Sequence, residues 1–291
     1  MAAQLVSLPE VERLSPAVLR ILGGNPGKFS LQGTNTYLLG TGPRRLLIDT
    51  GEGKPSWIAT LKRILAEENA SIESALLTHW HHDHIDGVPD LLRISPKTTV
   101  YKRDPHTGWL DIKDGQVFEV QGAALKAVYT PGHAIDHMVF VLKEENALFT
   151  GDNVLGQGTA VFEDLAAYLQ SLEQMGKLVS GRGYPGHGPV LPDVTAKISE
   201  YISHRYEREK QVLLTLDALK ETGDTSPSVA AAQSDAWSPI ELVKVIYAAY
   251  PENLHGPAVG GVVQILQKLQ KEGKVSLDNG DRWRLKDKSS L

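Results

Sequence analysis

The pattern of apolar and polar positions predicts a chain that alternates short strands with helices. Residues 36–39 and 45–48 are apolar runs separated by a Gly- and Pro-containing turn, which predicts a β-hairpin. Residues 56–68 place apolar side chains three or four positions apart, the spacing of an amphipathic helix. Further strands are predicted at 73–78, 98–102, 116–120, 123–130, 137–142 and 146–150, and a further helix at 161–178.

The last third of the chain has a different pattern. A helical pattern runs from beyond Pro192 to about Lys220, and the small, polar residues 223–237 predict a linker. Ser238 as N-cap and Pro239 in the first turn predict a helix that extends to about Tyr250, followed by a second helix at 257–272. Residues 275–277 and 282–285 then flank an Asn-Gly turn, which predicts a hairpin. We therefore expect two domains, residues 1–222 and 223–291, the second resembling a winged helix.

A dense group of ligand-type side chains follows the strand predicted at 73–78. Positions 79–84 read His-Trp-His-His-Asp-His, the pattern H-x-H-x-D-H. Three more such residues follow predicted strands or lie in Gly- and Pro-containing loops: His133, Asp152 and His187. Imidazole and carboxylate groups suit zinc and similar divalent ions, and a hydrolytic site needs them around an open coordination position. The set therefore predicts a metal-dependent hydrolase.

Composition limits the alternatives. The 291 residues include no cysteine, so neither disulfides nor thiolate ligands are available. A net charge of −5 argues against a protein that coats nucleic acid. Residues 256–291 carry seven basic and four acidic side chains, and this surplus of 7 − 4 = 3 favours a packing or dimerisation module over nucleic-acid readout. No long apolar run and no targeting pattern is present, so we expect a cytoplasmic protein with no membrane partner.

One glycine-rich segment has to be weighed against a phosphate-binding loop. Residues 23–28 read Gly-Gly-Asn-Pro-Gly-Lys, but Leu22 stands where the first glycine is required and Phe29 where Ser or Thr is required. The segment therefore predicts a turn that leads into the strand near Thr34.

The ordered ligand set over residues 34–188 resembles the metallo-β-lactamase superfamily. The resemblance implies an α/β (α+β) fold, the αββα sandwich of that family, with the metals at one edge. It assigns seven ligands to two divalent ions: His79, His81 and His133 to the first, Asp83, His84 and His187 to the second, and Asp152 to both. Zn²⁺ is the preferred assignment, and Mn²⁺ or iron also fits such ligands.

Two ions close together could share a hydroxide as nucleophile, because coordination lowers the pKa of water from 15.7 to about 7. Asp83 could orient this hydroxide or accept its proton. His82 occupies a position that does not hold a ligand and is expected to face solvent, whereas Asp136 and His137 are expected to support the ligands. The commonest subclass of zinc β-lactamases uses a cysteine ligand, so antibiotic hydrolysis is not expected here.

Further motifs narrow the resemblance. Residues 25–27, 31–37, 159–164 and 201–205, together with the winged-helix-like tail, resemble the branch that contains β-lactamase-like protein 2. They are more similar to its fungal relatives that act beside polyketide synthases as acyl-carrier-protein thioesterases. The implied reaction is cleavage of an acyl-carrier-protein thioester to release a polyketide product, and the implied partner is the acyl-carrier-protein domain of a polyketide synthase.

Two other interpretations stay open. Animal members of this branch are associated with cleavage of single-stranded RNA, and expulsion of an alkoxide from RNA benefits from a proton donor. His204 could be that donor, or it could simply be a partly exposed helix residue. The charges around it alternate in sign, which is typical of a solvated helix face, so we prefer the thioesterase. A scaffold protein with a vestigial hydrolase fold fits less well, because all seven ligand residues are present. The oligomeric state stays open.

Overall fold

The computed structural model describes residues 5–217, 236–252, 255–278 and 280–286. The chain divides into two compact units, Met1–Tyr201 and Ile202–Leu291. The boundary expected between residues 222 and 223 lies outside the described residues, so those domain limits stay a prediction.

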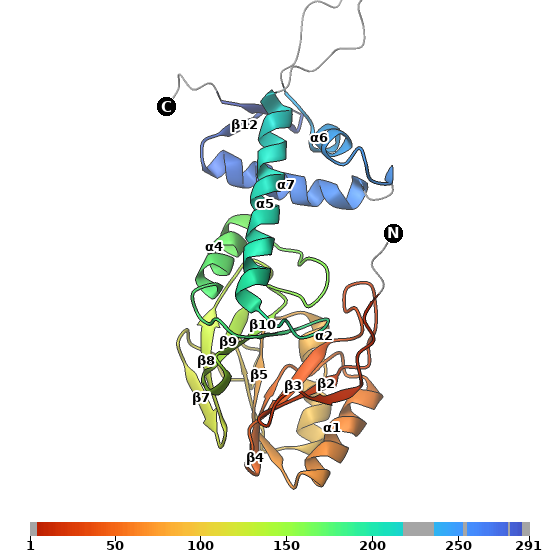
Figure 1. The fold of residues 1–291 in the computed structure, drawn as a ribbon, viewed down its shortest axis with the longest axis vertical. Helices are drawn as coiled ribbons and strands as arrows, with labels where there is room; N and C mark the ends of the chain where they lie inside the picture. The colour runs from red at the N-terminus through yellow and green to blue at the C-terminus, as the bar shows by residue number, and fades with distance from the viewer. Residues whose placement is uncertain (1–4, 218–235, 253–254, 279, 287–291) are drawn as a thin grey trace, which may run out of the picture. The chain divides into compact units, whose positions relative to one another are not determined.

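The first unit contains a six-stranded sheet with the order β1-β2-β3-β4-β5-β6 (Figure 1). Its strands are β1 (Val11–Arg13), β2 (Val18–Leu22), β3 (Asn35–Leu39), β4 (Arg44–Ile48), β5 (Ser71–Leu77) and β6 (Thr99–Lys102). The first four strands pair antiparallel, which confirms the hairpin predicted for β3 and β4, whereas β4, β5 and β6 are parallel. The parallel arrangement requires the helix between β4 and β5.

The second sheet has the order β11-β10-β9-β8-β7. Its strands are β7 (Val117–Val120), β8 (Ala123–Tyr129), β9 (Met138–Leu142), β10 (Ala147–Gly151) and β11 (Gly183–Pro185). Neighbours pair antiparallel except β10 and β11, which are parallel. Strands β8, β10 and β11 therefore run in one direction, and their carboxyl ends meet at one edge of the sheet.

The two sheets pack face to face, and helices cover the outer face of the first sheet. Alternate side chains of a strand point to opposite faces. On β3, Tyr37 and Leu39 therefore join Phe140 in the core between the sheets, whereas Leu38 joins the core beneath α1. Helices α1 (Pro55–Glu67) and α3 (Val88–Ile94) contribute to that outer core, and α4 (Leu165–Met175) lies beside the second sheet (Figure 1). The first unit is thus an αββα sandwich.

One helix is shorter than the sequence pattern predicts. The helix expected at 161–178 begins only at Leu165 and ends at Met175. Its start is fixed by Asp164, whose carboxylate accepts hydrogen bonds from the backbone N–H groups of Ala166 and Ala167. Apolar periodicity alone does not contain this capping information.

Several short elements were not predicted, among them β1, β2, α3 and β11. Strand β2 is buried along its whole length but contains Arg20, which pairs with Glu12 of β1, so its apolar run is interrupted. Helix α3 and strand β11 each contain a proline, which weakens the corresponding sequence pattern.

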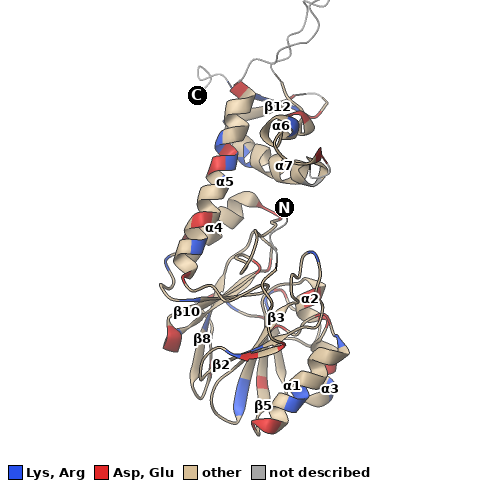
Figure 2. Ribbon diagram, turned by 45° about the vertical axis from the view of Figure 1, so that its right-hand side comes forward, with Lys and Arg blue, Asp and Glu red and all other residues tan. Residues whose placement is uncertain are grey.

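The second unit consists of the later part of α5 (Val194–Asp217), α6 (Pro239–Ile246), α7 (His255–Lys271) and the hairpin β12 (Val275–Asp278) and β13 (Arg282–Leu285). The two helices and the hairpin confirm the predicted order, although α6 ends before Tyr250. Asn279 of the predicted turn and residues 223–235 of the predicted linker lie outside the described residues. Figure 2 shows that basic and acidic positions alternate along α5. In the described parts of the chain, no helix is both long enough and apolar enough to span a membrane.

Candidate metal centre

Strand ends from both sheets carry the candidate ligands. His79 and His81 follow β5 of the first sheet, and the next residues form the single turn α2 (His82–Ile85) with Asp83 and His84. From the second sheet, His133 follows β8, Asp152 follows β10 and His187 follows β11. Strands can aim such side chains into one site because their own positions are fixed by the sheets.

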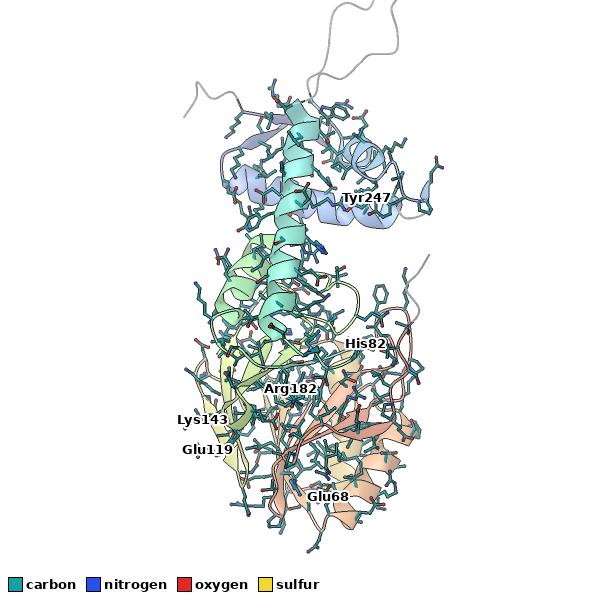
Figure 3. The ribbon with its side chains drawn as sticks, in the orientation of Figure 1. Glu68, His82, Glu119, Lys143, Arg182 and Tyr247 are labelled. Atoms are coloured by element: carbon teal, nitrogen blue, oxygen red, sulfur yellow. The ribbon has the colours of Figure 1, made fainter. Side chains whose placement is uncertain are left out.

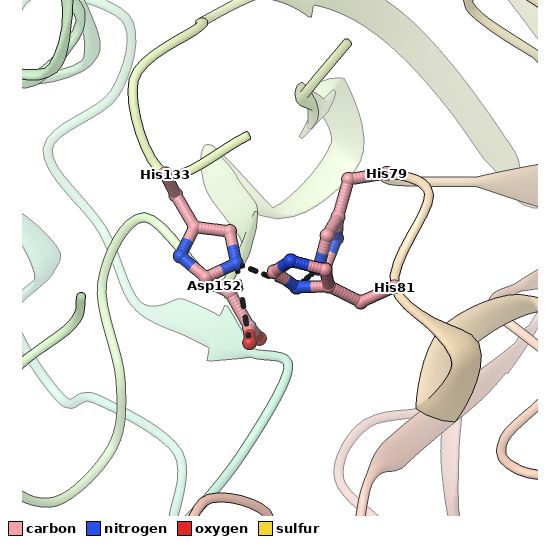
Figure 4. Close-up of side chains that lie close together, drawn as sticks. All are labelled: His79, His81, His133 and Asp152. Carbon is pink, nitrogen blue, oxygen red and sulfur yellow. Dashed lines mark hydrogen bonds and ion pairs between the residues drawn. The ribbon is translucent and has the colours of Figure 1, made fainter. Parts of the chain in front are cut away.

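The first group of candidate ligands is His79, His81, His133 and Asp152 (Figure 4). His79 Nε2 lies 2.9 Å from His81 Nδ1, and His133 Nε2 lies 3.1 Å from the same atom. Asp152 Oδ2 lies 3.7 Å from His133 Nε2. Atoms that are each about 2.0–2.1 Å from one tetrahedral zinc ion lie roughly 3.4 Å apart, so these spacings fit a single ion.

The second group is Asp83, His84 and His187. His187 Nε2 lies 3.3 Å from His84 Nε2 and 3.2 Å from Asp83 Oδ2. Asp152 reaches this group as well, since its Oδ1 lies 3.5 Å from His84 Nε2 and its Oδ2 lies 3.2 Å from His187 Nε2. Asp152 Oδ1 is buried and accepts no hydrogen bond, so it is available to a cation. The residues therefore fit two adjacent ions with one carboxylate between them.

Neighbouring groups fix which nitrogen of each histidine faces the site. His84 Nδ1 donates to Asp49 Oδ2 at 2.8 Å, and His133 Nδ1 donates to the Val161 carbonyl at 2.8 Å. Both bonds occupy Nδ1, so Nε2 faces the other candidate ligands and is the nitrogen that would bind an ion. Asp49 in turn accepts hydrogen bonds from the backbone N–H and the hydroxyl of Thr78, so it is held from two sides.

The carboxylates among the candidate ligands are held by neighbours too. His137 is buried, and its Nε2 accepts the backbone N–H of Asp152 at 3.1 Å. The hydroxyl of Thr34 donates to Asp83 Oδ2 at 3.1 Å. Gly186 is required beside Asp152, because a Cβ at this position would lie 2.2 Å from Asp152 Oδ1.

The two groups differ in electrostatics. Burial lowers the pKa of His79 well below its usual range and that of His81 to about 4, so these imidazoles are neutral. Burial also opposes charge on His84 and His187. The neighbouring Asp152 carboxylate outweighs it, so the pKa of His84 lies well above its usual range and that of His187 rises to about 9. The carboxylates around the second group thus favour a positive charge there, carried by protonated imidazoles without a metal.

A cavity of about 430 Å³ opens onto both groups. Its other lining residues include the apolar side chains of Phe29, Leu31, Leu155 and Val161. A larger hollow of about 770 Å³ lies elsewhere, beside α1 and α3, and none of the seven candidate ligands lines it. The smaller cavity is therefore the candidate active site.

The structure brings all seven predicted ligands together, and their role as ligands stays a prediction. His82, which is labelled in Figure 3, is exposed at the start of α2 and also lines the cavity. His204 lies on α5 in the second unit and belongs to neither group. Asp136 differs from expectation, because it pairs with Lys102 rather than with a ligand. Sequence reasoning missed Asp49, although an Asp-x-Gly sequence at the end of a buried strand was a usable signal.

Comparison with known proteins agrees with this geometry. The sequence profile of the metallo-beta-lactamase superfamily matches residues 30–187, and that of the beta-lactamase associated winged helix domain matches residues 238–283. The fold and the clustered ligand residues define a metal-dependent hydrolase. The chain belongs to the metallo-β-lactamase superfamily, and its C-terminal part is a winged helix, as the sequence predicted.

Curated relatives match almost the whole chain. "Lactamase-like protein nscB" of Aspergillus fumigatus is 46% identical over 96% of this chain and 86% of its own length. "Atrochrysone carboxyl ACP thioesterase" of Aspergillus chevalieri is 46% identical over 95% of this chain and 88% of its own length. "Lactamase-like protein vrtG" of Penicillium aethiopicum is 46% identical over 97% and 91%. These names confirm the predicted resemblance to fungal lactamase-like proteins.

Solved structures show the same fold at low identity. A metallo-β-lactamase family protein from Thermus thermophilus has a TM-score of 0.72 at 22% identity and covers 94% of this chain and 100% of its own. A beta-lactamase domain protein from Burkholderia ambifaria has a TM-score of 0.77 at 16% identity and covers 98% and 96%. At these identities the likeness concerns the fold alone.

Proposed function

We propose that this hydrolase cleaves the thioester that joins a polyketide acyl group to an acyl carrier protein. The observation that carries the proposal is the 46% identity, over 95% of the chain, to a protein named as an atrochrysone carboxyl ACP thioesterase. The partner would be the carrier-protein domain of a polyketide synthase. The apolar cavity beside the candidate ligands supports an acyl substrate, because acyl carbon atoms gain free energy when they leave water.

The proposed site holds two divalent ions, most readily Zn²⁺. His79, His81 and His133 would hold the first, Asp83, His84 and His187 the second, and Asp152 both. When bound, such ions activate a water molecule and polarise the carbonyl under attack. A thiolate is a good leaving group, so the reaction needs no protein side chain to protonate the departing sulfur.

The protein's own residues would orient the reactants. The His187 hydrogen bond and the nearby imidazoles outweigh the effect of burial and hold the pKa of Asp83 well below its usual range. Asp83 is therefore a carboxylate at neutral pH and suits the role of accepting a hydrogen bond from the attacking water. Because its pKa is low, it is better fitted to orient that water than to keep its proton.

The ribonuclease alternative has less support from the second unit. A surface that follows an RNA backbone needs free positive charge. Lys268 instead lies 2.7 Å from Glu209, and Lys274 lies 2.7 Å from Glu272. Arg284 is also paired with a carboxylate, that of Asp278, at 3.1 Å. His204 would act as proton donor only in this alternative.

A side-by-side assay tests the proposal. Metal-loaded protein is given an aromatic acyl thioester on carrier protein and, separately, a labelled single-stranded RNA, each with and without chelator. We expect chelator-sensitive thioester hydrolysis with intact RNA. RNA cleavage with an untouched thioester would reverse the assignment and make His204 the next target. In the same assay Asp86→Asn should keep the activity of the unsubstituted protein, because the exposed carboxylate of Asp86 lies close to Asp83 but belongs to neither ligand group.

A further inference from the structure

The loop that precedes β3 is closed by its own hydrogen bonds. At its base, the Asn25 side chain accepts the backbone N–H of Thr34 at 2.9 Å and donates to the Thr34 hydroxyl at 3.1 Å. Further along, the Ser30 hydroxyl donates to the Asn25 carbonyl, and the Gly27 N–H donates to the Leu31 carbonyl at 3.1 Å. These bonds preform the turn at the tip of the loop, so its side chains are presented without a large ordering cost.

The tip of this loop presents an aromatic ring to the cavity. Phe29 lines the cavity yet is 74% exposed, and the Lys28 ammonium lies 5.5 Å from the centre of its ring. The base of the loop contacts the ligand groups, because the Thr34 hydroxyl also donates to Asp83. The position of the ring is therefore linked through a few hydrogen bonds to a candidate metal ligand.

A second exposed apolar side chain lines the same cavity. Val161 is 61% exposed, and its carbonyl accepts the hydrogen bond from His133 Nδ1 at 2.8 Å. Phe29 and Val161 thus come from segments about 130 residues apart in sequence, and each segment contacts one of the two ligand groups. Exposed apolar side chains around a cavity of this size mark a surface that a ligand covers.

One charged side chain that belongs to neither candidate ligand group lines the cavity. Apart from the ligand residues and the exposed His82, Lys28 is the only basic or acidic residue among the described residues that line it. A lysine ammonium is a compact cation that suits an anionic oxygen. The cavity therefore combines an aromatic face, an aliphatic side chain and one cation.

We propose that Phe29 and Val161 are specificity-determining residues that hold a planar aromatic acyl group, and that Lys28 pairs with an anionic oxygen of the substrate. This inference rests on the proposed thioesterase function. Phe29 contributes a face on which a flat acyl group stacks, and Val161 packs against the same group. The anionic oxygen belongs either to the acyl group or to the phosphate of the carrier arm.

Two measurements test the proposed contacts of Phe29 and Val161, and the first of them does not depend on hydrolysis. Calorimetry measures the binding of a hydroxylated naphthoic acid to the protein, and steady-state kinetics compares naphthoyl and octanoyl pantetheine thioesters. We expect Phe29→Ala and Val161→Ser to weaken naphthoic acid binding and to raise KM for the naphthoyl thioester about tenfold, with kcat little changed. The octanoyl KM should change less than threefold, and Phe29→Trp should restore aromatic binding. Val117→Ser, at an exposed valine outside the cavity, is the control.

The outcomes separate the inference from the function on which it rests. If wild-type protein hydrolyses the thioesters but Phe29→Ala changes the naphthoyl and octanoyl KM values equally, or changes neither of them, the inference is wrong. The proposed thioesterase function then still holds. If wild-type protein hydrolyses no thioester, the proposed function fails, while Phe29-dependent binding of the acid would still support the aromatic site. Unchanged binding of the acid in Phe29→Ala and Val161→Ser would overturn the inference in either case.

The lysine is tested with thioesters that differ only in the arm. Lys28→Gln should raise KM about tenfold for acyl-phosphopantetheine alone if the lysine pairs with the phosphate. It should raise KM for acyl-pantetheine as well if the oxygen belongs to the acyl group. A KM unchanged on both substrates would refute the role of Lys28, and Lys126→Gln, at an exposed lysine outside the cavity, is the control.

Discussion

Asp49→Asn is the sharpest test of how the metal centre is positioned. Asp49 is buried and has a φ of 58°, in the left-handed region that asparagine also tolerates. The substitution therefore keeps side-chain size and backbone conformation but removes one acceptor oxygen. With its remaining oxygen facing the Thr78 N–H, the new amide would direct its NH₂ group at His84 Nδ1. His84 would then have to carry its proton on Nε2, which faces the other ligands.

The size of the loss in metal affinity follows from this conflict, in which the NH₂ group of the new amide faces the N–H donor of His84 Nδ1. Loss of a partner that orients a ligating histidine costs about 10–100-fold in metal affinity, or about 1.4–2.8 kcal/mol. The alternative orientation of the amide leaves a buried donor of Thr78 unsatisfied, which costs about 1–3 kcal/mol of folding stability. Either orientation therefore weakens the site or the fold by a measurable amount.

Competition with a fluorescent zinc chelator measures the affinity, and thermal unfolding of the chelated protein measures the stability. We expect one ion to be lost in competition at least tenfold more easily than in the wild type. Asp86→Asn is the control, because it makes the same change at an exposed carboxylate, four residues after His82. Zinc affinity within threefold of the wild type, with unchanged unfolding, would refute the assignment of Asp49 as the residue that orients His84.

Three other substitutions test separate parts of the structure. Asp152→Ala should lose most activity and at least one ion, because its carboxylate reaches both ligand groups; retained activity with two ions by elemental analysis would contradict this. Lys102→Met should destabilise the protein by about 3–5 kcal/mol in urea unfolding, because the buried Asp136 is left unpaired, and Lys102→Met with Asp136→Leu should recover most of that loss. Leu61→Ala should cost about 2–5 kcal/mol in the same assay because it opens a cavity beneath α1, and a loss under 1 kcal/mol would contradict that packing.

The elements with a clear apolar period were predictable from the sequence. The hairpin of β3 and β4 consists of two apolar runs around a Gly- and Pro-containing turn, and α1 has apolar side chains three or four positions apart. The predicted and observed bounds of these elements therefore agree within two residues. Strand β2 escaped prediction because Arg20 becomes acceptable in a buried strand only through its pairing with Glu12. Such compensation between neighbouring strands exists only in three dimensions.

The candidate ligands were predictable because their residue types are unusual in a core and recur at strand ends. The groups that position them were harder to foresee. The partner of His84 lies 35 residues earlier in the chain, and the partner of His133 is a backbone carbonyl, which carries no sequence signal. The exposed ring of Phe29 was not predicted to line the cavity, because its loop was interpreted only as a turn.

Because the candidate ligands come from two different sheets, the site can form only when both sheets have folded and packed together. Each group combines residues that follow β5 of the first sheet with residues from the second sheet, so neither sheet alone holds a full set. Ion binding would thus cross-link two halves that meet only when the core between them has formed. A partly folded chain would therefore have neither tight ion binding nor hydrolytic activity, so loss of bound ion would report loss of the packing between the two sheets.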